Sequence, residues 1–190
     1  MVTLEKMLPF FSYLVGTSDA LGQAHHERTA LIAGKIADAL ELSDELKNSI
    51  RLAALVHDIG KVAINDTILF KHGKYTDAER VMMETHPAVG ANFLRLLANS
   101  GVEVEESVIT IVIQHHENYD GTGYPYRVRN SKIHVGARVL RVADFYEAIT
   151  SQNRSYRSIL THEDALMLMK LEKRCFDPKI FEVFQTLDLS

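Results

Sequence analysis

Hydrophobic residues recur about every 3.6 positions along most of the chain, which is the spacing of one face of an α-helix. The pattern is clearest over residues 25–40, 44–56, 104–116 and 135–150. We find no stretch with the strict alternation of a half-buried strand, no internal repeat and no low-complexity linker. The pattern therefore predicts an all-α fold.

Capping signals place the starts of several helices. Ser43 is a suitable N-cap for the helix that runs to about residue 56. Thr76 and Glu79 form a capping-box pattern that opens a helix running to about residue 98. Pro87 lies inside that stretch and is expected to kink it just after His86. Two more helices are expected to begin at Thr161 and at Asp177-Pro178.

Glycines mark the breaks between these helices. Gly60 and Gly101 are expected to end helices, and residues 118–125 form a loop rich in turn-forming residues. With 190 residues, the chain has the length of one domain. We therefore predict a single compact helical domain over residues 1–190, with a helical extension at its C-terminal end.

The N-terminal segment Met7–Gly16 is apolar and could be mistaken for a signal peptide. Its only preceding basic side chain is Lys6, which Glu5 offsets, whereas signal peptides begin with a distinctly basic region. The segment is also far shorter than the roughly 20 residues that cross a bilayer. We interpret residues 1–20 as a packing or linking helix and expect no membrane association.

Composition narrows the possible partners and compartment. A net charge of −4 disfavours a protein that binds DNA or RNA polymers, because phosphate contacts require a basic surface. Cys175 is the only cysteine, so no internal disulfide can form. A reducing compartment such as the cytoplasm fits this usage.

Histidines and aspartates stand beside apolar runs at several places. His57-Asp58 closes one apolar helix, and His115-His116 closes another. Buried polar groups are costly unless they are paired or bound to a metal. Seven such groups are enough for two metals, and mixed imidazole and carboxylate ligands suit Fe, Mn, Zn, Co or Ni rather than Ca or Mg. The seven candidates are His25, His57, Asp58, His86, His115, His116 and Asp144.

Each single residue also has an ordinary structural reading. Alone, His25 or His86 would more often be a helix-face or core histidine, and Asp144 a cap or an ion-pair partner. The combination with two adjacent pairs favours a metal site. The other histidines lack this context and are interpreted as surface residues: His26, His72, His134 and His162.

Two longer motifs carry a family resemblance. Residues 57–61, HDIGK, resemble the HDxGK signature of the HD superfamily of metal-dependent phosphohydrolases. Residues 115–125, HHENYDGTGYP, resemble the HHExxDGxGYP signature of its HD-GYP subgroup. The similarity extends from about His25 to Arg157 and beyond. It implies an HD-domain helical bundle and hydrolysis of cyclic di-GMP to pGpG, often onward to GMP.

The resemblance also implies a metal centre of two divalent transition ions, most often Fe or Mn, with Asp58 bridging them. Some relatives hold a third metal through a glutamate one turn before the first histidine, and Leu21 stands at that position here. Two metals are therefore expected. One would be bound by His25, His57, Asp58 and Asp144, and the other by Asp58, His86, His115 and His116.

The expected mechanism uses the two metals to neutralise phosphate charge and to lower the pKa of a shared water, whose bridging hydroxide attacks phosphorus. Asp58 and Lys61 are the catalytic candidates, since Lys61 follows Asp58 by one turn and can hold a phosphate oxygen. Arg154 and Arg157 resemble the family's phosphate-binding SxRPYR segment, which here is one residue longer and has Ser155 in place of proline. The other substrate-binding candidates are Gly121, Gly123, Tyr124 and Pro125.

The segment after Pro125 departs from the family pattern, because Arg127 and Asn130 replace glycines and His134 replaces proline. The loop is therefore expected to be shaped differently, which leaves the choice of cyclic dinucleotide open. Residues 121–143 contain no acidic residue, and their basic side chains are expected either to form a basic mouth or simply a solvated face. These side chains are Arg127, Arg129, Lys132, Arg138 and Arg141.

Two other functions remain open from sequence alone. The chain could hydrolyse another cyclic dinucleotide, such as cyclic GMP-AMP. It could also be a non-catalytic signalling module that binds a nucleotide or a protein. A regulatory domain or a signalling protein is a possible partner, and the oligomeric state is not predicted.

Overall fold

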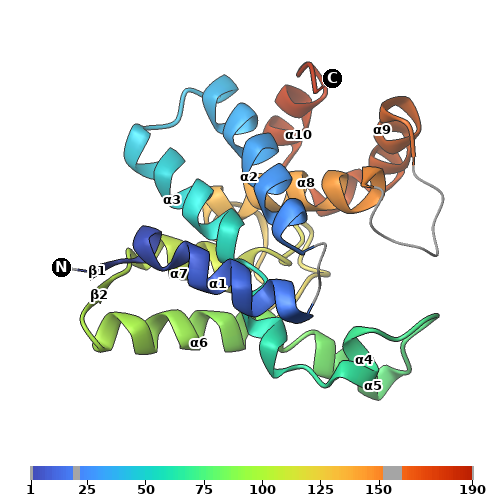
Figure 1. The fold of residues 1–190 in the computed structure, drawn as a ribbon. Helices are drawn as coiled ribbons and strands as arrows, with labels where there is room; N and C mark the ends of the chain where they lie inside the picture. The colour runs from blue at the N-terminus through green and yellow to red at the C-terminus, as the bar shows by residue number, and fades with distance from the viewer. Residues whose placement is uncertain (1, 19–21, 152–159, 190) are drawn as a thin grey trace.

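The computed structural model describes residues 2–18, 22–151 and 160–189. Its body consists of long helices that cross one another around a common core (Figure 1). These are α1 (Leu4–Ser18), α2 (Gly22–Ala39), α3 (Asp44–Val56), α6 (His86–Asn99), α7 (Glu106–Gln114) and α8 (Val135–Thr150). The expected all-α fold is confirmed.

Shorter elements connect and flank the body. The 3-10 helix η1 (Ile59–Ala63) follows α3, and α9 and α10 lie beside α8 at the C-terminal end (Figure 1). Phe181 and Phe184 of α10 are buried, so the C-terminal helices extend the core. The remaining bounds are α4 (Asp66–Leu69), α5 (Asp77–Met83), η2 (Asn130–Lys132), α9 (His162–Leu171), η3 (Lys173–Cys175) and α10 (Pro178–Phe184).

Close packing of α8 against its neighbours holds the centre of the bundle together. Ile36, Ile50 and Leu140 are fully buried there, each from a different helix. A Cβ atom at Gly136, in the first turn of α8, would lie 2.5 Å from Ile111 Cδ1. Any larger residue at this position would therefore require the Ile111 side chain of α7 to shift within the packed core.

The N-terminal helix α1 packs against the other helices. Leu4 and Phe11 are each 2% exposed, and the Phe11 ring meets Phe93 of α6 edge-on at 5.8 Å. Within the described ranges, no helix combines the length and apolar character that a bilayer crossing requires.

Two sequence expectations about the backbone were wrong. The helix opened by Thr76 does not kink after His86; α5 ends at Met83 and α6 begins at His86. Pro87 explains this, since proline lacks an N–H and clashes with the preceding turn but is well tolerated in the first turn of a helix. The other error concerns strands: Val2–Thr3 (β1) pairs in parallel with Val102–Glu103 (β2), a pair too short to show a periodicity.

Candidate metal centre

Three histidines stand where helices end. His57 follows α3, His86 follows α5 and opens α6, and His115 follows α7. Each Nδ1 lies 2.6–2.8 Å from a backbone carbonyl oxygen three residues earlier. A carbonyl can only accept, so each Nδ1 donates a proton to it, and Nε2 is the ring nitrogen that remains for a ligand role. The carbonyls belong to Ala54, Met83 and Val112.

These Nε2 atoms converge on Asp58. His86 Nε2 lies 3.3 Å from His115 Nε2 and 3.3 Å from Asp58 Oδ1. Burial lowers the pKa of His86 to about 4 and that of His115 well below its ordinary value, so both rings are neutral at pH 7. With no proton available between the facing nitrogens, the arrangement suits a cation bound among them.

A second set of donors lies on the other side of Asp58. Asp144 Oδ1, from α8, lies 3.2 Å from His25 Nε2 and 3.6 Å from His57 Nε2. His57 Nε2 also lies 3.6 Å from Asp58 Oδ2. Burial opposes a charge on His25, but hydrogen bonds to Asp144 and Glu147 raise its pKa to about 10. A metal at this position would have to displace that proton.

Glu147 is a site residue that the sequence analysis missed. It is 1% exposed, its carboxylate hydrogen-bonds His25 Nδ1, and its other oxygen accepts from Arg28 Nε at 2.7 Å. Carboxylates that hold the second nitrogen of a ligand histidine fix the ring and raise its basicity. A signal existed in the sequence, since Glu147 follows Asp144 by three residues and therefore shares its helix face.

The donors form two groups that share Asp58. In each group the ligand atoms lie within 4.8 Å of one another. His26 Nε2, His57 Nε2 and Asp58 Oδ1 are buried without a hydrogen-bond partner among the described residues. Each such atom costs about 1–3 kcal/mol if it stays unpaired, so the residues present fit metal ions. The groups are His25, His26, His57 and Asp58, and Asp58, His86, His115 and His116.

The interpretation of four histidines as surface residues was wrong for His26. His26 is 4% exposed, because α2 turns it toward Asp58 and against the His57 ring. His134 is half-buried, and its side chain caps α8 by accepting from the Gly136 amide at 3.1 Å. His72 and His162 are exposed, as expected.

Lys61 points at the centre as its spacing predicted. Its Nζ lies 2.5 Å from Asp58 Oδ2, and its side chain is partly exposed. Burial works against the negative charge of Asp58, but Lys61 and then His57 hold its pKa well below the usual range. Asp58 is therefore ionised and available as a ligand at neutral pH.

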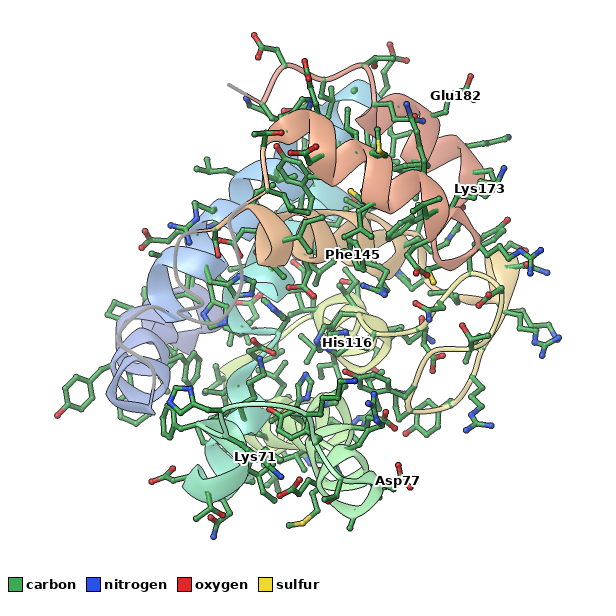
Figure 2. All side chains as sticks on the ribbon, turned by 90° about the vertical axis from the view of Figure 1, so that its right-hand side faces the viewer. Lys71, Asp77, His116, Phe145, Lys173 and Glu182 are labelled. Atoms are coloured by element: carbon green, nitrogen blue, oxygen red, sulfur yellow. The ribbon has the colours of Figure 1, made fainter. Side chains whose placement is uncertain are left out.

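The HHENYDGTGYP segment wraps the second donor group. The Tyr124 ring lies 4.7 Å from the His116 ring, and Figure 2 shows His116 near the middle of the molecule. Gly123 is buried, and a Cβ atom there would lie 2.3 Å from the His116 carbonyl oxygen. The Gly121 amide donates to Asn118 O at 2.7 Å. In this geometry both glycines shape the loop.

Glu117 anchors the chain that follows this loop. It is 1% exposed and accepts from the Tyr126 amide at 2.7 Å and the Val128 amide at 3.0 Å. The sequence alone predicted no role for Glu117 beyond its place in the motif. Its two backbone contacts fix where residues 126–128 lie relative to His116.

A cavity of about 310 Å³ opens beside the loop. Tyr124, Pro125 and Arg127 line one side, and Glu84 and Thr85, which join α5 to α6, line another. Because Tyr124 touches both the cavity and His116, the cavity borders the second donor group.

Two of the basic side chains after Pro125, Arg138 and Arg141, have partners within the domain. Arg138 is ion-paired with Asp177. Arg141 donates to Asn118 Oδ1 at 2.9 Å, and its guanidinium lies 5.2 Å from the Phe145 ring centroid. Of the predicted basic mouth, Arg127 is the member that lines the cavity. Three sequence predictions fall outside the described residues, those for Leu21, Arg154 and Arg157.

Arg127 and Asn130 both have φ near +55°, the left-handed region that glycine occupies at no cost. Their replacement of glycine has therefore not removed this conformation. Arginine pays about 1 kcal/mol there, whereas asparagine tolerates it. We expect Arg127→Gly to raise the free energy of unfolding by about 0.5–1 kcal/mol and Asn130→Gly to leave it nearly unchanged. Urea denaturation at fixed metal content measures the free energy of unfolding of both variants. A lower free energy of unfolding for Arg127→Gly would show that the backbone at Arg127 is not strained.

The chain is similar to known proteins over most of its length. A family model described as HD domain matches residues 10–180. The cyclic di-GMP phosphodiesterase response regulator RpfG of Xanthomonas campestris pv. campestris (strain 8004) is 36% identical over 178 residues, which cover 93% of this chain and 45% of RpfG. The 3'3'-cGAMP-specific phosphodiesterase 2 of Vibrio cholerae serotype O1 is 34% identical over 161 residues, which cover 84% of this chain and 30% of that enzyme. The chain thus spans less than half the length of either relative.

A solved structure shares the fold at lower sequence identity. An HDG"Y"P protein from Bdellovibrio bacteriovorus superposes with a TM-score of 0.69 at 17% identity. The match covers 96% of this chain and 59% of that protein.

Proposed function

Since this chain belongs to the HD-domain family, we propose that it is a metal-dependent phosphodiesterase that hydrolyses cyclic di-GMP to pGpG. The proposed metals are two divalent transition ions. Fe and Mn are favoured over Zn, Ni and Co. The cytoplasm is the proposed location. A regulatory domain or partner protein is also proposed, because RpfG is named a response regulator and extends well beyond the matched part.

The observation that carries the proposal is the pair of donor groups that share Asp58. His25, His57, Asp58 and Asp144 are proposed to hold one ion; Asp58, His86, His115 and His116 are proposed to hold the other. The protonated Nδ1 atoms of three of these histidines leave Nε2 free on the inside. A domain that only bound a nucleotide would not need so many buried ring nitrogens and carboxylate oxygens that lack hydrogen-bond partners among the described residues.

Two such ions, when bound, supply charge that neutralises phosphate oxygens and lower the pKa of water toward 7. The chain's own part is to position the reacting groups. Lys61, fixed by its ion pair with Asp58, offers a positive charge for a phosphate oxygen as negative charge builds in the transition state. Desolvation lowers the pKa of His115 and of His116 well below the ordinary value, so both rings are neutral at pH 7 and offer ring nitrogens to the second group.

Substrate is proposed to enter through the cavity beside Tyr124. The cavity size lies at the low end for a small-molecule site, so it would take part of a dinucleotide rather than all of it. The Tyr124 ring already packs on His116, and this contact supports a positioning role. Arg127 gives the cavity a basic wall that suits an anionic ligand. Arg154 and Arg157 remain candidates for phosphate contact.

The second candidate function is hydrolysis of cyclic GMP-AMP. It is favoured by the similarity to the cGAMP-specific enzyme of Vibrio cholerae and by Arg127, whose side chain lines the cavity where the family pattern has glycine. A third candidate, a non-catalytic binding module, has no such observation in its favour.

A substrate panel tests the proposal. Protein loaded anaerobically with Fe(II) or with Mn is incubated with cyclic di-GMP, cyclic GMP-AMP and cyclic di-AMP, and the products are separated by chromatography. We expect cyclic di-GMP to give pGpG with the highest kcat/KM. A preference for cyclic GMP-AMP would change the proposed substrate but leave the proposed phosphodiesterase activity in place. No turnover of any cyclic dinucleotide in either metal form would overturn the proposed function.

A further inference from the structure

His26 lies inside the centre although it neighbours another candidate ligand on the same helix. Consecutive helical residues point about 100° apart, so the two rings leave α2 in different directions. Here α2 packs against both α3 and α8. His25 therefore reaches Asp144 and Glu147 on α8, while His26 reaches Asp58 at the end of α3.

The side chain of His26 is enclosed by the other rings. Its centroid lies 5.4 Å from that of His25 and 4.9 Å from that of His57, which it meets edge-on. Its Nε2 is buried, has no hydrogen-bond partner in the described part of the chain and lies 3.7 Å from Asp58 Oδ2. A histidine that merely filled the core would be expected to have its ring nitrogens hydrogen-bonded.

The spacing of this nitrogen suits one ion shared with its neighbours. Ligand atoms around one metal, each at about 2.0–2.2 Å, are separated by about 3–4.4 Å. The 3.7 Å between His26 Nε2 and Asp58 Oδ2 falls in this range, as does the 3.6 Å between His57 Nε2 and Asp58 Oδ2.

We propose that His26 Nε2 is a ligand of the metal ion held by His25, His57, Asp58 and Asp144. The inference rests on the proposed metal centre and adds to it a donor outside the seven residues predicted from the sequence. The first ion then has His25, His26, His57, Asp58 and Asp144, while the second keeps Asp58, His86, His115 and His116. The centre is asymmetric, with more open positions for substrate at the second ion, beside Tyr124 and the cavity.

Metal content and ligand spectroscopy test the role of His26. His26→Ala and the bulkier, shape-preserving His26→Gln are compared with the unchanged chain and with His72→Ala, which removes an exposed histidine between α4 and α5. All are loaded with Mn under one protocol, desalted and measured for metal per chain, for release rate into a chelator and for imidazole coupling by pulsed electron paramagnetic resonance. Circular dichroism of the metal-free proteins establishes which variants fold.

We expect each folded His26 variant to release one of its ions about 10–100-fold faster and to lose part of the imidazole coupling. His72→Ala should match the unchanged chain. If a His26 variant keeps the parent's metal content, release rate and coupling, His26 is a packing residue and the inference falls. If the unchanged chain binds no metal at all, the proposed function falls with it. If His26→Gln folds and His26→Ala does not, the rate at which His26→Gln releases metal tests the inference.

Discussion

Asp58→Asn is expected to lower kcat/KM for the cyclic dinucleotide by about 1,000-fold or more, equivalent to roughly 4 kcal/mol of transition-state stabilisation. Asp58 is the one residue shared by both donor groups, with its Oδ1 facing His86 and its Oδ2 facing His57 and Lys61. Asparagine keeps the shape but removes the charge and one of the two ligand oxygens. Metal content should fall together with activity.

The control for Asp58→Asn is Asp66→Asn, which makes the same chemical change at an exposed position in α4. It should leave both activity and metal content within about two-fold, since surface changes away from such sites are mild. Steady-state kinetics and elemental analysis on the same preparations give the comparison. Full activity in Asp58→Asn would mean that no shared carboxylate is needed.

Gly60→Ala is expected to lower the free energy of unfolding by about 2–4 kcal/mol and to reduce activity as well. A Cβ atom at Gly60 would lie 2.0 Å from the His86 carbonyl oxygen and 2.6 Å from the Gly90 amide nitrogen. Both are backbone atoms of α6, so no flexible side chain can move aside. The added methyl group must push η1, which carries Lys61, away from the helix that carries His86.

Gly34→Ala is the matched control, because Gly34 lies within α2 and a Cβ atom there meets nothing within 4 Å. In a helix interior, alanine is favoured over glycine by about 0.5–1 kcal/mol, so this variant should be slightly more stable. Chemical denaturation of both metal-free proteins measures the difference. Equal stability of the Gly60 and Gly34 variants would show that η1 and α6 can separate without cost.

The sequence predicted helices well where capping residues were specific. Ser43 caps α3 and Thr161 caps α9 as expected. The break between α5 and α6 was misplaced because a proline fits both a kink and a first turn, and tertiary packing decides between them. The adjacent pairs His57-Asp58 and His115-His116, together with the single candidates His25 and His86, make up six of the seven residues in the two donor groups.

What the sequence could not predict depends on contacts between distant segments. His26 was assigned to the surface because no motif or apolar helix end gave it a context, and the approach of α3 and α8 to α2 is not encoded locally. Glu147 and Glu117 act on residues brought close by folding, namely His25 and the backbone of Tyr126 and Val128. Periodicity indicates that such side chains are buried but not what they touch.

The ring hydrogen bonds of His57, His86 and His115 tie the candidate centre to the integrity of three helix termini. Each ring ties down a carbonyl in the last turn of the helix before it, where the final carbonyls lack intrahelical partners. Ion binding and helix fraying are thus parts of one equilibrium, and anything that binds only the folded ends stabilises them by mass action. Loss of an ion would first cause local opening of the last turns of α3, α5 and α7, while the apolar core between α2, α3 and α8 stays closed.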